Sequence, residues 1–184
     1  MTQIKINYLY EIILSLLKKD THWRELTNEL NTSLTRVQSI LSELRDHNVI
    51  DYKTEGRNNI YFIKKNLISK SYILNAENYK LTKLLRRYTF LEPLFNEITK
   101  KYPNLLIILF GSYAKFIAKE DSDIDVYIYT SDKNVKKEIK NIYDKLSIKI
   151  GSFKKEDLLI QEIIKNHIII QGGEIYYEKL KFFR

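Results

Sequence analysis

The sequence predicts an α+β chain made of two different parts joined by a helical segment. The first 66 residues combine apolar side chains at helical spacing with two short strand-like runs round a turn. Residues 102–184 contain apolar runs of strand length, NLLIILF, DVYIY and LSIKI, separated by helical segments. A length of 184 residues with 44% hydrophobic residues suffices for one domain or two small ones.

Three helices and a hairpin are predicted for the N-terminal part. The first helix covers residues 4–19, the second runs from about Thr21 to Leu30 with Thr21 as its cap, and the third follows Ser33, which is placed to cap it. Apolar residues mark one face of the first helix (Ile4, Ile6, Leu9, Ile12, Ile13, Leu16 and Leu17) and one of the third (Leu34, Val37, Ile40, Leu41 and Leu44). The run VIDYKTEGRNNIYFIKK then predicts two strands round a turn containing Gly56, Asn58 and Asn59.

This order resembles a winged helix-turn-helix domain, and the resemblance covers residues 1–66. It implies that the third helix lies in the major groove of double-stranded DNA and that the hairpin contacts the DNA backbone or minor groove. The implied DNA-binding residues are Ser33, Thr35, Arg36, Gln38, Ser39 and Arg57, with Thr32, Ser42, Lys53, Asn58 and Asn59 beside them. A homodimer is expected because paired half-sites match a two-fold protein.

Charge and composition limit the classes of partner. The net charge of +8 favours polyanions, although residues 1–66 carry 10 basic and only 8 acidic side chains. The absence of cysteine excludes disulfides and predicts a reducing cytoplasm, and no apolar run is long enough for a membrane span. Residues 67–101 are expected to form a helical linker, a dimerisation surface or the first helix of the next domain.

The stretch FGSYAKFIAKEDSDIDVYIY contains the candidate chemistry. Gly111 and Ser112 follow a predicted buried strand, and the glycine lets backbone amides approach a ligand closely. A helix that began near Tyr113 would favour a phosphate at its amino end. Because side chains alternate along a strand, Asp123 and Asp125 share one face, about 6–7 Å apart, where both can bind a hard cation.

These residues resemble the signature of the DNA polymerase beta-like nucleotidyltransferase superfamily, and residues 102–184 resemble its minimal members. The resemblance implies a mixed sheet flanked by helices. It also implies that Gly111, Ser112 and Lys115 bind a nucleoside triphosphate, ATP or another, and that the catalytic pair Asp123 and Asp125 binds Mg²⁺.

Two positions depart from the pattern of that superfamily. Phe116 stands where glycine is usual, beside the expected pocket. The strand expected to carry a third carboxylate is LSIKI (Leu146–Ile150), whose polar residues are Ser147 and Lys149. A lysine ammonium there would pair with the aspartates and compete with metal.

The sequence therefore leaves three functions open. The first is a transcription-regulator-like DNA-binding protein, whose second domain binds nucleotide or keeps only the fold. The second is an active Mg²⁺-dependent adenylyltransferase, antitoxin-like, that modifies a hydroxyl of a toxin-like protein partner. The third is a homodimer in which both domains make protein contacts.

Overall fold

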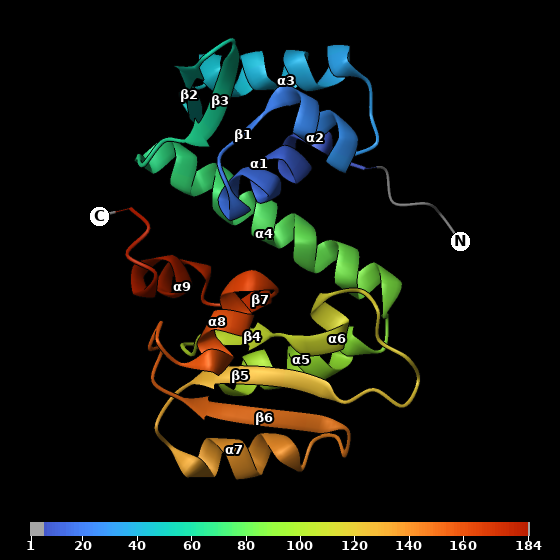
Figure 1. Ribbon diagram of the computed structural model, residues 1–184. Coiled ribbons are helices and arrows are strands. Elements are labelled where there is room, and N and C mark those ends of the chain that lie inside the picture. The colour runs from blue at the N-terminus through green and yellow to red at the C-terminus, as the bar shows by residue number, and fades with distance from the viewer. Residues whose placement is uncertain (1–5, 184) are drawn as a thin grey trace. The chain divides into compact units, whose positions relative to one another are not determined.

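The computed structural model describes residues 6–183, which divide into two compact units (Figure 1). Residues 6–79 with Phe183 form the first unit, and Lys80–Phe182 forms the second. The long helix α4 (Leu67–Arg87) contributes residues to both. Residues 67–101, the predicted linker, contain α4 and a second helix. Ile4, the first residue of the apolar stripe predicted for the first helix, lies outside the described residues.

The first unit combines helices with an antiparallel sheet of strand order β1-β3-β2. In the hairpin, Ile50 pairs with Ile63 and Glu55 with Asn58, so the turn falls at Gly56 and Arg57. The prediction was right for Gly56 but wrong for Asn58 and Asn59, which pair with Glu55 and Thr54 within the sheet. The elements are α1 (Tyr8–Lys18), β1 (Thr21–His22), α2 (Trp23–Glu29), α3 (Leu34–Asp46), β2 (Ile50–Glu55) and β3 (Asn58–Ile63).

Apolar side chains at helical spacing form the core of this unit. The central parts of the predicted stripes are confirmed as buried faces of α1 and α3, because a residue every third or fourth position returns to the same side of a helix. Ile6 and Leu34, at the beginning of each stripe, are exposed instead. Buried members of the core include Ile12, Ile13, Leu16, Leu26, Val37, Leu41 and Leu44.

Helix α2 begins differently from the prediction. Thr21 was expected to cap it, but Thr21 lies in β1, paired with Tyr61, and His22 is the capping residue. The His22 Nδ1 atom accepts a hydrogen bond from the Glu25 amide at 3.2 Å. Strand β1 has only two residues, too few to show a periodic pattern in the sequence. The start of α2 therefore lies one residue later than predicted.

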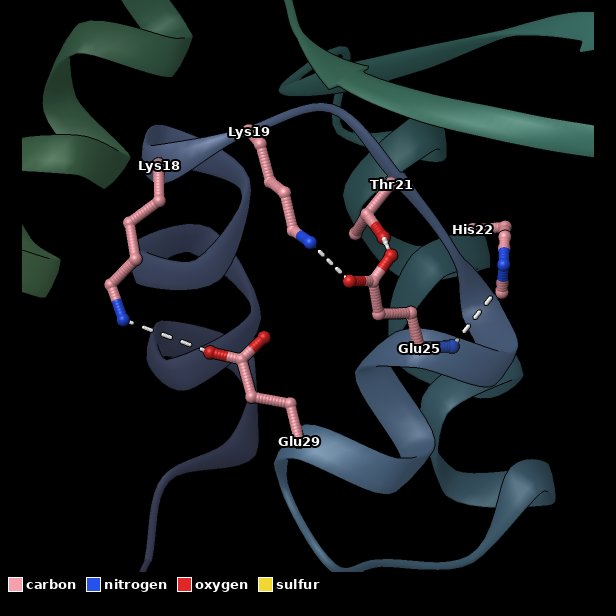
Figure 2. Close-up of polar contacts among 6 residues, drawn as sticks. All are labelled: Lys18, Lys19, Thr21, His22, Glu25 and Glu29. Atoms are coloured by element: carbon pink, nitrogen blue, oxygen red, sulfur yellow. Dashed lines mark hydrogen bonds and ion pairs between the residues drawn. The ribbon is translucent and has the colours of Figure 1, made fainter.

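A small polar network joins the end of α1 to α2 (Figure 2). The Glu25 carboxylate accepts hydrogen bonds from the Lys19 ammonium and from the Thr21 hydroxyl. The Lys18 ammonium lies 3.7 Å from the Glu29 carboxylate in a second ion pair. Both hydrogen bonds lower the pKa of Glu25 from its ordinary value, the one from Lys19 most strongly.

The second unit contains a mixed four-stranded sheet of order β6-β5-β4-β7, in which β5 and β6 are parallel and the other pairs are antiparallel. Mixed strand directions and flanking helices agree with the expected architecture. The elements after α4 are α5 (Leu91–Lys101), β4 (Ile107–Leu109), α6 (Gly111–Ala114), β5 (Ile124–Tyr129), α7 (Lys133–Lys140), β6 (Leu146–Gly151), α8 (Leu158–Lys165), β7 (Ile168–Gln171) and α9 (Gly173–Lys179).

The two faces of this sheet carry different residues. Ile124, Val126 and Ile128 of β5 point into an apolar cluster that α5 and α7 complete. On the other face, Tyr127 packs edge-on against Phe153, whose ring also meets Tyr176 of α9. Aromatic packing therefore covers that face near the carboxyl end of β5, while Asp125 lies at its beginning. No helix in the described part of the chain is long and apolar enough to cross a membrane.

The Glu25 network gives a pH-dependent prediction for the first unit. Because the folded pKa of Glu25 is depressed, its stabilisation is present above the ordinary value of 4.5 and is lost as the pH falls through the folded pKa. Glu25→Gln should therefore lower the urea midpoint at pH 7 and leave it unchanged at acid pH below that pKa. Glu43→Gln, on the exposed face of α3, is the matched control. An equal loss at both pH values would contradict this prediction.

Candidate functional site

Strand β5 positions the two candidate carboxylates. Asp125 is the second residue of the strand and is half-buried, while Asp123 immediately precedes the strand and is exposed. The flanking residues Ile124 and Val126 point into the apolar cluster. Since strand side chains alternate between faces, Asp125 points away from that cluster.

The Gly111 backbone lies close to the side chain of Asp125. Gly111 has a φ of +69°, and a Cβ atom built on it would overlap Oδ2 of Asp125 and lie 3.2 Å from Cγ of the same carboxylate. The Phe110 amide also donates a hydrogen bond to the Asp125 carbonyl at 2.9 Å. Glycine is therefore required here for two reasons, the left-handed backbone and the missing side chain.

Helix α6 is a single turn that starts at Gly111, two residues before the expected helix start at Tyr113. Ser112 is the second residue of this turn and is half-buried. So short a helix supplies backbone N–H groups near Asp125, but it has little of the aligned dipole of a long helix. The phosphate groups of a ligand would therefore meet only a few backbone amides and the Ser112 hydroxyl here, without the field of a long helix.

Strand β6 lies directly beside the carboxylates. In the parallel pairing, Asp125 is opposite Ser147 and Tyr127 is opposite Lys149. Ser147 thus occupies the strand position nearest to Asp125, and it carries a hydroxyl where the resemblance to nucleotidyltransferases implies a carboxylate. The alignment of LSIKI with this strand, made from the sequence, agrees with the observed register.

The electrostatics of Asp125 follow from these neighbours. Burial raises the pKa of Asp125 above its ordinary value, and a hydrogen bond from Ser147 offsets part of that rise. The negative charges of Asp123 and Glu162 raise this pKa further, whereas the positive charge of Lys149 lowers it. Ionised Asp125 is therefore held in a setting that a cation would relieve.

Lys115 meets a residue that the sequence reasoning missed. Its ammonium lies 3.1 Å from Oε1 of Glu162 in α8, and both side chains are partly exposed. Glu162 is the single acidic residue of the helix LLIQEIIK, and that isolated charge was the available signal. The pair joins the end of α6 to α8, and its two residues are 47 apart in the sequence.

Phe116 adopts a left-handed backbone conformation, with a φ of +59°. This geometry explains why glycine would suit the position, since other residues enter it at an energetic cost. Its ring packs against the apolar cluster, and both Lys83 and Arg87 lie 5.9 Å from its centre.

The two carboxylates would supply part of a coordination shell if a divalent cation bound here. Within residues 6–183, no group of three or more histidine, cysteine, aspartate or glutamate side chains could hold a metal ion. Mg²⁺ is commonly bound by one or two carboxylates together with water and substrate phosphates. Asp123 and Asp125 fit that donor set, because Asp125 is a half-buried anion that a cation would relieve.

The predicted DNA-binding residues lie in the first unit. Thr35, Arg36, Gln38 and Ser39 are exposed on α3, and Arg57 is exposed in the β2–β3 turn. The Ser33 hydroxyl accepts a hydrogen bond from the Arg36 amide at 3.3 Å, so it caps α3 as predicted. The structure thus groups the two sets of candidate residues in separate units.

Comparison with known proteins identifies the second unit. The family model described as "Polymerase beta, Nucleotidyltransferase" matches residues 95–179. The "Putative protein adenylyltransferase MJ1547" of Methanocaldococcus jannaschii is 40% identical over 85 residues, which is 42% of this chain and 68% of that protein. The chain belongs to the polymerase beta nucleotidyltransferase family. The matched residues include every element from β4 to α9, with the Gly111–Asp125 contact among them.

Two solved structures show weaker likeness. A mutant of Lactococcus lactis ZitR matches with a TM-score of 0.39 and 13% identity, over 55% of this chain and 66% of that one. A toxin–antitoxin structure with AMP-PNP matches with a TM-score of 0.34 and 21% identity, over 58% of this chain and 86% of that one. At these scores, neither likeness bears on the function of this nucleotidyltransferase-family chain.

The Gly111–Asp125 contact predicts a steric cost for any side chain at residue 111. Gly111→Ala should destabilise the second unit by roughly 2–4 kcal/mol, the sum of left-handed strain and a clash with Oδ2. Urea denaturation would measure the change. Asp125→Ala removes the overlap with Oδ2 and Cγ and leaves only the 3.3 Å approach to its Cβ, so the cost should fall to about 1–2 kcal/mol, mostly backbone strain. Equal costs in both backgrounds would show that the contact is unimportant.

Proposed function

We propose that this chain is a DNA-binding protein whose nucleotidyltransferase-family unit binds a nucleoside triphosphate with Mg²⁺. The observation that carries the DNA-binding part is the element order of the first unit. The elements follow in the order α1-β1-α2-α3-β2-β3, and the strands form a sheet of order β1-β3-β2. This arrangement is the one expected of a winged helix, in which α3 enters the major groove and the β2–β3 hairpin is the wing.

The exposed face of α3 supports base and phosphate contacts. Arg36 stacks over the Tyr8 ring, with 5.0 Å from Cζ to the ring centre, and donates a hydrogen bond to the Thr32 hydroxyl at 3.4 Å. Near the other end of the helix, Arg45 stacks over Tyr52 at 5.0 Å. A guanidinium held against an aromatic ring loses less conformational freedom on binding than a free side chain does.

The wing contributes Arg57 rather than Lys53. The Lys53 ammonium lies 2.9 Å from the Glu55 carboxylate, so binding DNA through Lys53 would first break this exposed ion pair. Arg57 lies at the turn and is exposed. We therefore assign the backbone contact of the wing to Arg57.

DNA binding predicts different effects for these two arginines. Arg36→Ala should weaken specific binding by about 1–3 kcal/mol and relax the sequence preference if it reads a base, whereas Arg57→Ala should weaken binding to all sequences and lower the salt slope by about one. Selection from a random duplex pool, followed by titrations at several salt concentrations, would measure both. Lys18→Ala, which removes a charge paired with Glu29, is the control. No retention of duplex DNA at low salt would reject the proposal.

For the second unit, the contacts of Asp125 support nucleotide binding. Asp123 and Asp125 would hold Mg²⁺, which supplies charge neutralisation to a triphosphate. Ser112 and the neighbouring amides would orient the phosphates, because Gly111 lets the chain come close to Asp125. Lys115 would contribute positive charge after leaving Glu162.

Protein adenylylation is the second candidate function. It is favoured by the 40% identity to a protein named as a putative protein adenylyltransferase. In that reaction a partner hydroxyl, such as one on a toxin-like protein, would attack the α-phosphate and release pyrophosphate. Ser147 at the third position argues against efficient transfer, since a hydroxyl cannot supply the anionic charge of a carboxylate.

Calorimetric titration of ATP in the presence of Mg²⁺ tests the nucleotide site. Asp125→Asn should weaken binding by roughly ten- to a hundredfold, because one charge-assisted contact contributes about 1.5–3 kcal/mol. Asp144→Asn, at an exposed position before β6, is the control. Absence of ATP binding by the wild type would reject the nucleotide-binding part of the proposal, and only the DNA-binding part would remain. Transfer of label from α-labelled ATP by Ser147→Asp, but not by the wild type, would attribute inactivity to the missing carboxylate.

A further inference from the structure

A lysine lies on the same sheet face as the candidate metal site. In the parallel β5–β6 pair, Ser147 is opposite Asp125, and Lys149 is two residues farther along β6. Residues two apart on a strand point to the same side, so Lys149 shares the face of Ser147 and Asp125. Strand β6 is the edge strand of the sheet, and Lys149 is exposed there.

Lys149 differs from the other lysines near this site. Lys115 is engaged by Glu162 at 3.1 Å, and Lys145 donates a hydrogen bond to the Glu120 carbonyl at 2.6 Å. Within residues 6–183, Lys149 has no hydrogen-bond or ion-pair partner, although its charge reaches Asp125 and lowers the pKa of that carboxyl. Its ammonium is therefore the one of the three that can meet an incoming anion without breaking a contact.

The charges at the site leave a role for such a cation. Asp123 and Asp125 provide two negative charges, which suit one divalent ion, and Ser147 adds only a neutral oxygen. A triphosphate brings several more negative charges, which need further positive charge close by. Lysine supplies this as a mobile point charge that does not depend on fixed geometry.

We propose that Lys149 binds the phosphate chain of the nucleotide and takes the charge-neutralising part that a second metal ion would otherwise play. This inference rests on the proposed nucleotide site and assigns the residue that completes it. It replaces the expectation that Lys149 competes with metal for Asp125, because Asp125 already has Ser147 as its hydrogen-bond partner and Lys149 acts on it through charge alone.

The test compares the affinities of ATP, ADP and AMP for four proteins: wild type, Lys149→Ala, Lys149→Arg and Lys154→Ala. Lys154 is an exposed lysine of the same unit, in the loop before α8, and is the matched control. Calorimetry would be run with Mg²⁺ and again with a chelator, and thermal unfolding of each variant would show that the fold is retained.

Lys149→Ala should weaken ATP binding by roughly ten- to a hundredfold, with and without Mg²⁺, and should leave AMP binding nearly unchanged. Lys149→Arg should restore most of the affinity, which a merely structural role would not explain. Lys154→Ala should behave like the wild type.

Three results would overturn the inference. Equal affinities for Lys149→Ala and Lys154→Ala would remove Lys149 from the site. Tighter binding of Mg²⁺ and ATP by Lys149→Ala would show that the ammonium competes with metal. Absence of ATP binding by the wild type would reject the proposed nucleotide site, and the role of Lys149 with it.

Discussion

The candidate site depends on the approach of Gly111 to the carboxylate of Asp125. A backbone with no side chain at that point lets the end of β4 lie against the beginning of β5. The single turn of α6, with Ser112 as its second residue, starts at this contact, and Asp125 accepts a hydrogen bond from Ser147. Asp125 is half-buried, and burial raises its pKa, so its ionised form is unfavourable in a protein without a bound cation.

The residues opposite Asp125 decide the charge of the site. Because side chains alternate along a strand, only every second residue of β6 faces the site. Those residues are Ser147 and Lys149. Neither is acidic, and the remaining acid, Glu162, is held by Lys115. The site is thus better suited to hold a charged ligand than to remove a proton from an acceptor, which is why we place nucleotide binding before transfer.

Much of this arrangement could be read from the sequence, because it depends on local periodicity. Alternation in IDVYIY places Asp125 opposite the core, and the spacing of Val37, Leu41 and Leu44 gives the buried face of α3. The Lys115–Glu162 pair could not be read in this way, since it joins residues 47 apart whose meeting depends on how α8 packs. Strand β1 was missed because two residues are too few for a period.

At Phe116, the backbone conformation favours glycine, whereas the contacts of the side chain require an aromatic ring. A glycine there would relax the loop between α6 and β5, but it would remove the ring on which Lys83 and Arg87 lie. Backbone strain at this point is therefore the condition for keeping two cations of α4 over a single aromatic surface. Selection that tolerates the strain keeps α4 in contact with the loop between α6 and β5, so substitutions at Lys83, Arg87 and Phe116 should be correlated rather than independent.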